Sequence, residues 1–248
     1  MSLANKYETA EFLKKDPSQF MHRFCDSQPD AECVAFIAAN LAFGRREQIL
    51  SHVQKILSLI KNDDVSPCHW ILSGLYKNYF PQSKKSFYRM YSFEQMRLFF
   101  EGIESILKES GSLGKFYQQK WENNTTKKYL HEVIAESFPC ECALISRSCG
   151  GAAKKLNMFL RWMVRDNSSV DLGLWKWYSK ANLLIPLDTH VMQEACKFGF
   201  IKKTSAGKIP SANLKTAVQL TNIMNEFFPG DPARADYALF GLGTDTQN

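Results

Sequence analysis

The sequence predicts an all-α fold. Apolar residues recur at helical spacing over most of the chain, whereas Val, Ile, Thr and Tyr form no convincing alternating runs. With 248 residues, 45% of them hydrophobic, the chain is long enough for one large domain or for two lobes. It contains no run of about 18 apolar residues, so we expect no membrane span.

Helices are expected in order along the first half of the chain. Residues 31–60 carry a dense apolar pattern that is interrupted at Gly44, which predicts two helices meeting there. Further helices are expected at 70–79, 93–108, 113–117 and 127–138. Gly111, between two serines, marks the end of the 93–108 helix.

The second half of the chain predicts four more helices. They are expected around 156–163, at 189–198, at 211–228 and from Pro232 onward. Asp188 has the position of an N-cap, and Gly199 that of a C-terminal stop, for the helix between them. Asp231 is expected to cap the last helix in the same way.

Charge and cysteine content restrict the class of protein. The net charge of +6 permits contact with a polyanion but does not demand it. The seven cysteines include no CxxC pair, so we expect reduced thiols and neither a metal nor another cofactor. The amino-terminal segment lacks the apolar core of a signal peptide, and a cytoplasmic location is therefore expected.

Two adjacent lysines begin the helix that carries the apolar stripe. At 100° per residue the stripe centres near Leu156, so Lys154 is expected on the opposite face, in solvent. Lys155 lies on the flank of the stripe, next to Phe159, where it could border an aromatic pocket. The positive end of the helix dipole and partial burial both favour a neutral amine, which is the nucleophilic form.

Asp188 supplies a carboxylate at another helix start. An ionised carboxylate beside a nucleophilic amine can stabilise a developing sugar cation and move protons, which is the chemistry of N-glycosidic bond cleavage. The alternative interpretation is that Asp188 only caps its helix and that the lysine only faces solvent.

The segment LDTHV at 187–191 resembles the (V/L)DTHV segment of the helix-hairpin-helix DNA glycosylases related to endonuclease III and the adenine glycosylase MutY. Gly151, Ala153 and Lys155 would lie over the Gly-x-Gly-x-Lys of that superfamily's hairpin, with Ala153 in place of the second glycine. FIAANLAFGRREQI at 36–49 is similar to its early helix pair, and DPARADYALFGLG at 231–243 to its closing helix.

This resemblance implies a single glycosylase-like unit over 1–248, made of two helical lobes around a cleft. The hairpin and lysine helix would span 146–166, the DTHV helix 187–199 and the closing helices 211–243. Lys155 would be the nucleophile and Asp188 the carboxylate of a DNA glycosylase/AP lyase. Its partner would be double-stranded DNA containing a damaged base, with 8-oxoguanine as one candidate.

The resemblance also implies residues that contact DNA and the extruded base. Phosphate contacts are expected from the hairpin backbone and from basic side chains: Gly150, Gly151, Lys154, Arg161, Arg165, Arg45 and Arg46. Candidates for the base pocket are mostly aromatic: Trp162, Phe159, Trp175, Trp177 and His190. Large aromatic side chains are otherwise expected in the core.

Two departures separate the chain from endonuclease III. Lys155 and Asp188 are 33 residues apart, a longer spacing that is similar to the archaeal 8-oxoguanine glycosylase branch. No cysteine follows Cys196, so the carboxy-terminal iron–sulfur cluster is not expected. Over its whole length, from MHRF at 21–24 to ALFGLG at 238–243, the chain most resembles an uncharacterised bacterial family of about this length.

Two other functions stay open at this point. The chain could be a non-catalytic DNA-binding relative, because the second hairpin glycine is replaced. It could also be a cytoplasmic enzyme acting on a small molecule, with His190 or Cys149 in the same cleft. The sequence predicts no oligomeric state.

Overall fold

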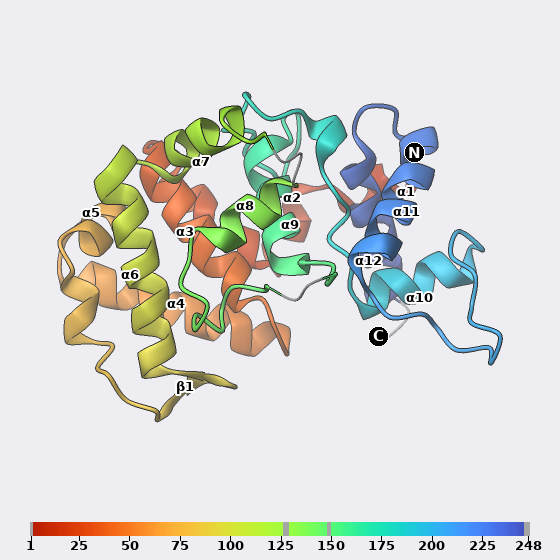
Figure 1. Cartoon of the computed structure of the whole chain (residues 1–248). Coiled ribbons are helices and arrows are strands. Elements are labelled where there is room, and N and C mark those ends of the chain that lie inside the picture. The colour runs from red at the N-terminus through yellow and green to blue at the C-terminus, as the bar shows by residue number, and fades with distance from the viewer. Residues whose placement is uncertain (1, 126–128, 148–149, 246–248) are drawn as a thin grey trace. The chain divides into compact units, whose positions relative to one another are not determined.

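The structure is a computed structural model that describes residues 2–125, 129–147 and 150–245 (Figure 1). Across these ranges the chain is predominantly helical, which confirms the predicted all-α class. The chain divides into two compact units. Met1–Lys14 and Ser148–Asn248 form the first unit, and Lys15–Arg147 forms the second.

The second unit is built around α3, which spans Gln28–Leu41. Every residue from Asp30 to Leu41 is buried, as expected of a helix that other elements surround on all sides. Phe36 on α3 stacks on Phe99 and Phe138, in both cases with ring centroids 5.5 Å apart. The other helical elements of this unit are η1 (Pro17–Phe24), α4 (Arg46–Asn62), α5 (Pro67–Leu72), η2 (Leu75–Asn78), α6 (Phe93–Ser110), α7 (Leu113–Glu122) and α8 (Leu130–Glu136).

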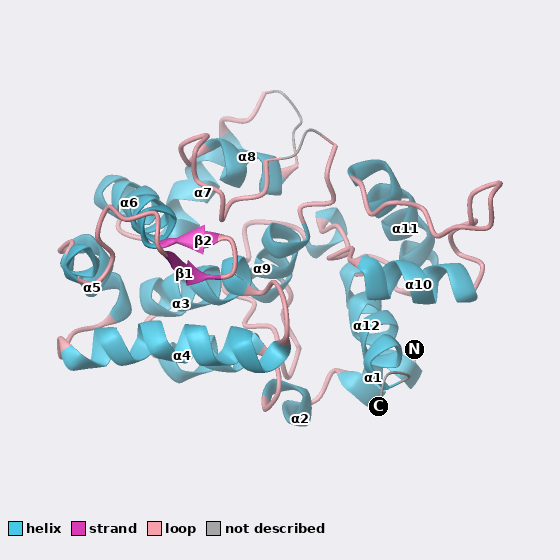
Figure 2. Cartoon of the chain, turned by 90° about the horizontal axis from the view of Figure 1, so that it is seen from below, coloured by secondary structure: helices cyan, strands magenta, loops and turns pink. Residues whose placement is uncertain are grey.

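A short antiparallel hairpin, which the sequence did not predict, precedes α6 (Figure 2). Its strands are β1 (Ser86–Tyr88) and β2 (Tyr91–Ser92). Strands of three and two residues are too short to show an alternating pattern, and for that reason the periodicity missed them. The breaks expected at Gly44 and Gly111 are confirmed, because α3 ends and α4 begins on either side of the first and α6 ends at the second.

The first unit brings the two ends of the chain together. Helix α12 (Ala235–Asp245) packs against both α10 (Thr189–Lys197) and α1 (Ser2–Tyr7) (Figure 1). Its core includes Leu187, Val191 and Leu239. The remaining elements of this unit are α2 (Ala10–Leu13), α9 (Lys154–Val164), η3 (Lys180–Asn182), α11 (Leu214–Phe227) and η4 (Pro232–Arg234).

Ion pairs and close packing explain why the amino-terminal residues belong to this unit. The Glu8 carboxylate lies 2.9 Å from the Arg165 guanidinium and 2.8 Å from that of Arg234. A Cβ placed on Gly241 of α12 would come within 2.2 Å of the Tyr7 ring. Helix α12 therefore needs a glycine where the amino-terminal helix crosses it.

Two expected features differ from the structure. No helix directly precedes Gly150 among the described residues, because α8 ends at Glu136 and residues 139–145 form turns. The hairpin expected from 146 therefore has no described helix directly on its amino-terminal side, and it includes residues 148–149, which lie outside the described residues. Asp231 stands at the expected N-cap position, before η4, but its side chain makes no capping hydrogen bond; its carboxylate binds Arg165 instead.

Candidate active site

A fixed turn at 150–153 sets the start of α9. The Gly150 carbonyl accepts a hydrogen bond from the Leu214 N–H at 2.7 Å. The buried Asn157 side-chain amide donates to the Ala152 carbonyl at 2.9 Å. Ala153 then adopts a φ of +44°, a left-handed conformation that is uncommon for a residue with a Cβ. The first turn of α9 is thereby held beside the start of α11.

Asp188 occupies the start of α10 and meets Lys154. Its Oδ1 accepts a hydrogen bond from the Val191 N–H at 3.0 Å, which confirms the predicted N-cap. Its Oδ2 lies 2.9 Å from the Lys154 Nζ. The lysine side chain is 31% exposed and that of Asp188 is 17% exposed. An amine and a carboxylate that are distant in sequence therefore lie in contact at a solvent-accessible position. We call these two residues the Lys154–Asp188 pair.

The expectation that Lys154 points into solvent was wrong. It assumed that one face of the helix is buried, whereas every residue of α9 from Leu156 to Val164 is buried. Side chains in a first turn lean toward the helix N-terminus, and α10 begins there. Lys155, the expected nucleophile, is half-buried next to Lys154.

The surroundings keep the Asp188 carboxylate ionised. Burial raises its pKa, but the Lys154 charge and the Val191 N–H outweigh that effect and hold the pKa below the usual value. Asp236, on α12, behaves differently: burial raises its pKa to about 6 although Arg161 opposes the shift. The two carboxylates thus lie in one unit but differ in how readily they bind a proton.

Helix α12 contributes residues to this place that the sequence analysis did not select. The ring centroid of Phe240 lies 6.0 Å from the Lys154 Nζ, within the range of a cation–π contact. Asp236 lies one helical turn before Phe240 and acts electrostatically on both members of the pair. A Cβ on Gly243 would lie 3.3 Å from His190, so α12 approaches the first turn of α10 closely. Asp236, Phe240 and Gly243 have i, i+4 and i, i+7 spacing, which places them on one face of the closing helix; this spacing is the sequence pattern that could have identified them.

Arg161 and Arg165 are buried, and carboxylates surround them. Arg165 binds Asp231 through two hydrogen bonds of 2.7 and 2.9 Å and also binds Asp171 and Glu8. Arg161 binds Asp171 and Asp236. We call the group the buried arginine network; its members are Glu8, Arg161, Arg165, Asp171, Asp231, Asp236 and Tyr237. The expected phosphate contacts of Arg161 and Arg165 are not compatible with this burial, because their donors are already engaged.

Three of the five base-pocket candidates belong to the core. Phe159, Trp162 and Trp175 are fully buried, and Phe159 packs edge-on against Trp175 at 5.2 Å. A ring without an exposed face has no room for an extruded base, so these three do not form a base pocket. Trp177, which stacks on Trp175 at 5.3 Å, and His190 are partly exposed and remain candidates.

The other expected phosphate contacts are spread over both units. Gly150 is exposed, whereas Gly151 is half-buried and pairs with Asn213 in an isolated bridge. Arg45 is exposed at the N-cap of α4, in the second unit, and Arg46 is half-buried in its first turn. Cys149, the alternative nucleophile, lies outside the described residues.

Within the described ranges, no three His, Cys, Asp or Glu side chains lie close enough together to hold a metal ion. No helix of the described part of the chain has the length and apolar character needed to cross a membrane.

The fold and the site define a predominantly helical protein of two units, one of which carries a lysine–aspartate pair at two helix starts. Residues 16–245 match the family described as "Protein of unknown function (DUF2400)", and the chain belongs to that family. Comparison with curated proteins finds no match. Comparison with solved structures finds none either.

Proposed function

We propose that the protein is a DNA base-excision enzyme that cleaves the N-glycosidic bond of a damaged base in double-stranded DNA. The observation that carries the proposal is the 2.9 Å contact between the Lys154 Nζ and the Asp188 Oδ2, at the starts of two helices. Asp188 is the carboxylate that the resemblance to helix-hairpin-helix glycosylases implies. The contact favours Lys154, rather than Lys155, as the amine.

The backbone before α9 supports the same proposal. In the resemblance, Ala153 replaces the second hairpin glycine, and its φ of +44° is a conformation that glycine adopts without strain. The backbone at Ala153 therefore suits the glycine that helix-hairpin-helix glycosylases have at this position, although this chain has alanine there. Both side chains of the pair are partly exposed, so solvent reaches them.

The reaction can be written with the residues of the pair. Asp188 accepts a proton from the Lys154 ammonium, and the free amine attacks C1′ of the damaged nucleotide. The bond between C1′ and the base breaks with its electrons on the base, which takes the proton from Asp188. The new C–N linkage then loses a proton to Asp188, which passes it to the ring oxygen as the sugar opens to a Schiff base. Asp188, ionised again, takes the C2′ proton, and the bond between C3′ and its oxygen breaks, which releases the 3′ phosphate and cleaves the strand.

A duplex that carries 8-oxoguanine or an abasic site, treated with borohydride, tests the proposal. The wild-type protein should form a covalent adduct, the Lys154→Ala and Asp188→Asn variants should not, and Lys155→Ala should retain it. Adduct formation by Lys154→Ala would overturn the assignment of the amine.

One observation favours a second candidate, a non-catalytic DNA-binding relative. Both oxygens of Asp188 are engaged, one with the Val191 N–H and the other with Lys154, as in a purely structural cap. Salt-dependent duplex binding without base release or adduct on either substrate would favour this candidate.

A further inference from the structure

We propose that a surface of the first unit, formed by Phe198, Phe200, Phe227, Lys197, Lys202 and Lys203, binds single-stranded DNA. We call it the aromatic–lysine surface. This surface shares no residue with the Lys154–Asp188 pair. The inference concerns binding of a strand and not cleavage of a base. Only the choice of DNA over RNA rests on the proposed function.

Three rings form a connected row at this surface. Phe198 and Phe200 stack with centroids 5.9 Å apart, and Phe200 meets Phe227 at 5.6 Å. The two outer rings are largely open to solvent, Phe198 being 52% exposed and Phe227 49% exposed. Phe200 is partly buried against the core of the unit and anchors the row.

The backbone fixes these rings before any ligand binds. Helix α10 ends at Lys197, and Gly199 follows with a φ of +74°. The N–H groups of Phe200 and Ile201 both donate to the Ala195 carbonyl, at 2.9 and 3.2 Å. The chain is thereby turned back onto the helix end, which places Phe198 and Phe200 side by side. Fixed rings lose little conformational entropy on binding.

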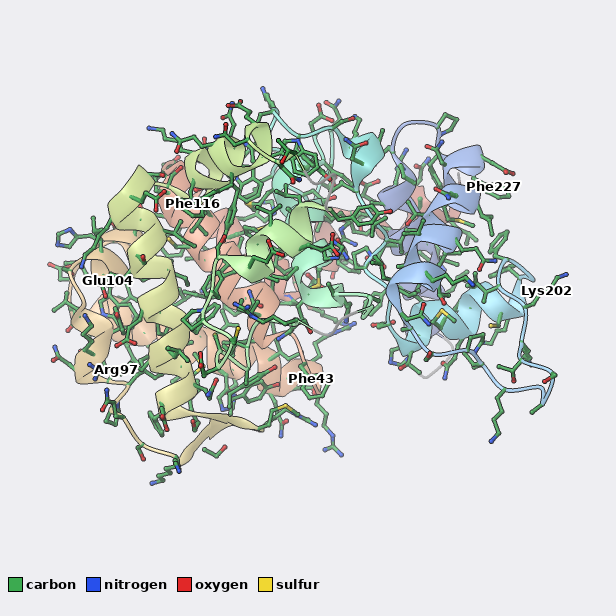
Figure 3. All side chains as sticks on the ribbon, in the orientation of Figure 1. Phe43, Arg97, Glu104, Phe116, Lys202 and Phe227 are labelled. Atoms are coloured by element: carbon green, nitrogen blue, oxygen red, sulfur yellow. The ribbon has the colours of Figure 1, made fainter. Side chains whose placement is uncertain are left out.

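Positive charge accompanies the rings. From Lys197 to Lys215 the sequence contains five lysines and neither Asp nor Glu, and all five lysines are exposed. One residue separates Phe200 from Lys202 and Lys203, and Lys197 directly precedes Phe198. The Lys197 Nζ forms an ion pair with the Oε1 of the buried Glu194, 2.6 Å away. Lys202 and Lys203 are therefore the main phosphate contacts. Figure 3 labels Lys202 and Phe227 at the outer margin of this unit.

The combination of rings and lysines favours a single strand over other anionic partners. Unstacked bases offer flat faces to aromatic rings, while the phosphates between them need cations, and single-strand-binding proteins combine these two features. Paired bases inside a duplex cannot offer these faces. An anionic membrane would use the rings only as apolar groups, and an acidic protein would gain little from a row of stacked rings.

Fluorescence anisotropy with a labelled 12-nucleotide single strand tests the inference. Replacing Phe198 and Phe227 by Leu keeps apolar side chains but removes the ring faces, and affinity should fall about 10-fold for each ring. Replacing Lys202 and Lys203 by Gln should make the slope of log affinity against log salt shallower by about 1.4, since each lost phosphate contact contributes about 0.7. Circular dichroism checks the folding of these surface variants, which should match that of the wild type.

Matched controls lie in the second unit. Lys84 and Lys85 are another adjacent exposed pair, and Phe43 is another exposed ring, 43% accessible (Figure 3). Replacing them in the same ways should leave binding unchanged.

The inference is overturned if the wild type does not bind the strand, if the Leu variants bind as the wild type does, or if the controls have equal effects. It is also overturned if an RNA of the same sequence, or vesicles with anionic lipids, bind more tightly. Lys154→Ala should bind the strand normally whether or not the protein releases bases, so failure of this inference and failure of the proposed function are separable.

Discussion

Substitution of Arg165 by Gln is predicted to destabilise the first unit strongly. The guanidinium is buried and binds three carboxylates, those of Glu8, Asp171 and Asp231. Glu8 keeps its ion pair with Arg234, and Asp171 keeps its ion pair with Arg161. Asp231, by contrast, loses both hydrogen bonds from Arg165 and must be hydrated instead. Removing one partner of a buried ion pair costs about 3–5 kcal/mol, and the partial exposure of Asp231 keeps the cost near the middle of that range.

Urea unfolding followed by circular dichroism at pH 7 measures this change. A loss of about 4 kcal/mol corresponds to a fall in Tm of roughly 8–16 °C for a chain of this size. Arg45→Gln, at an exposed position, should change stability by less than about 0.5 kcal/mol. A loss below about 1 kcal/mol for Arg165→Gln, with an unchanged m-value, would refute the buried arginine network and would make Arg165 a phosphate contact again.

Three further predictions concern the first unit. Ala153→Gly should raise the free energy of unfolding by about 0.5–1 kcal/mol, because glycine adopts a φ of +44° without strain; a lower urea midpoint would contradict this. Because the folded pKa of Asp188 is lowered, its carboxylate contributes stability above the unfolded pKa of about 3.9 and loses it as pH falls through the folded value. The difference in unfolding free energy between wild type and Asp188→Asn should therefore shrink from pH 5 to pH 2.5 in urea titrations, and a difference that grows would show the wrong sign. Gly241→Ala should cost about 1–3 kcal/mol, since its Cβ would meet the Tyr7 ring at 2.2 Å; an unchanged Tm would mean that α1 does not pack there.

Local signals in the sequence predicted local structure well. The Asp188 cap, the left-handed Gly199 and the break around Gly44 depend on a few neighbouring residues, and the structure has each of them. The all-α class followed from periodicity for the same reason. The helix-hairpin-helix glycosylase topology depends on how helices pack over long separations, and it remains part of the proposal.

Long-range pairing accounts for what the sequence analysis missed. Arg161 and Arg165 were expected at the surface because charged residues on a helix usually lie there. The carboxylates that bury Arg165 include Asp231, 66 residues away, and Glu8, 157 residues away, so no local pattern shows them. The contact of Lys154 with Asp188 has no local pattern either, since it depends on where α10 begins in space relative to α9.

Peptide mapping of the borohydride-reduced adduct tests whether the Lys154–Asp188 pair breaks the glycosidic bond. The protein would be trapped on a duplex with a damaged base, digested, and the modified lysine located by mass spectrometry. We predict a reduced sugar adduct on Lys154 in the wild type and none in Asp188→Asn. An adduct on Lys155 or on a lysine outside α9, or no adduct at all, would contradict it.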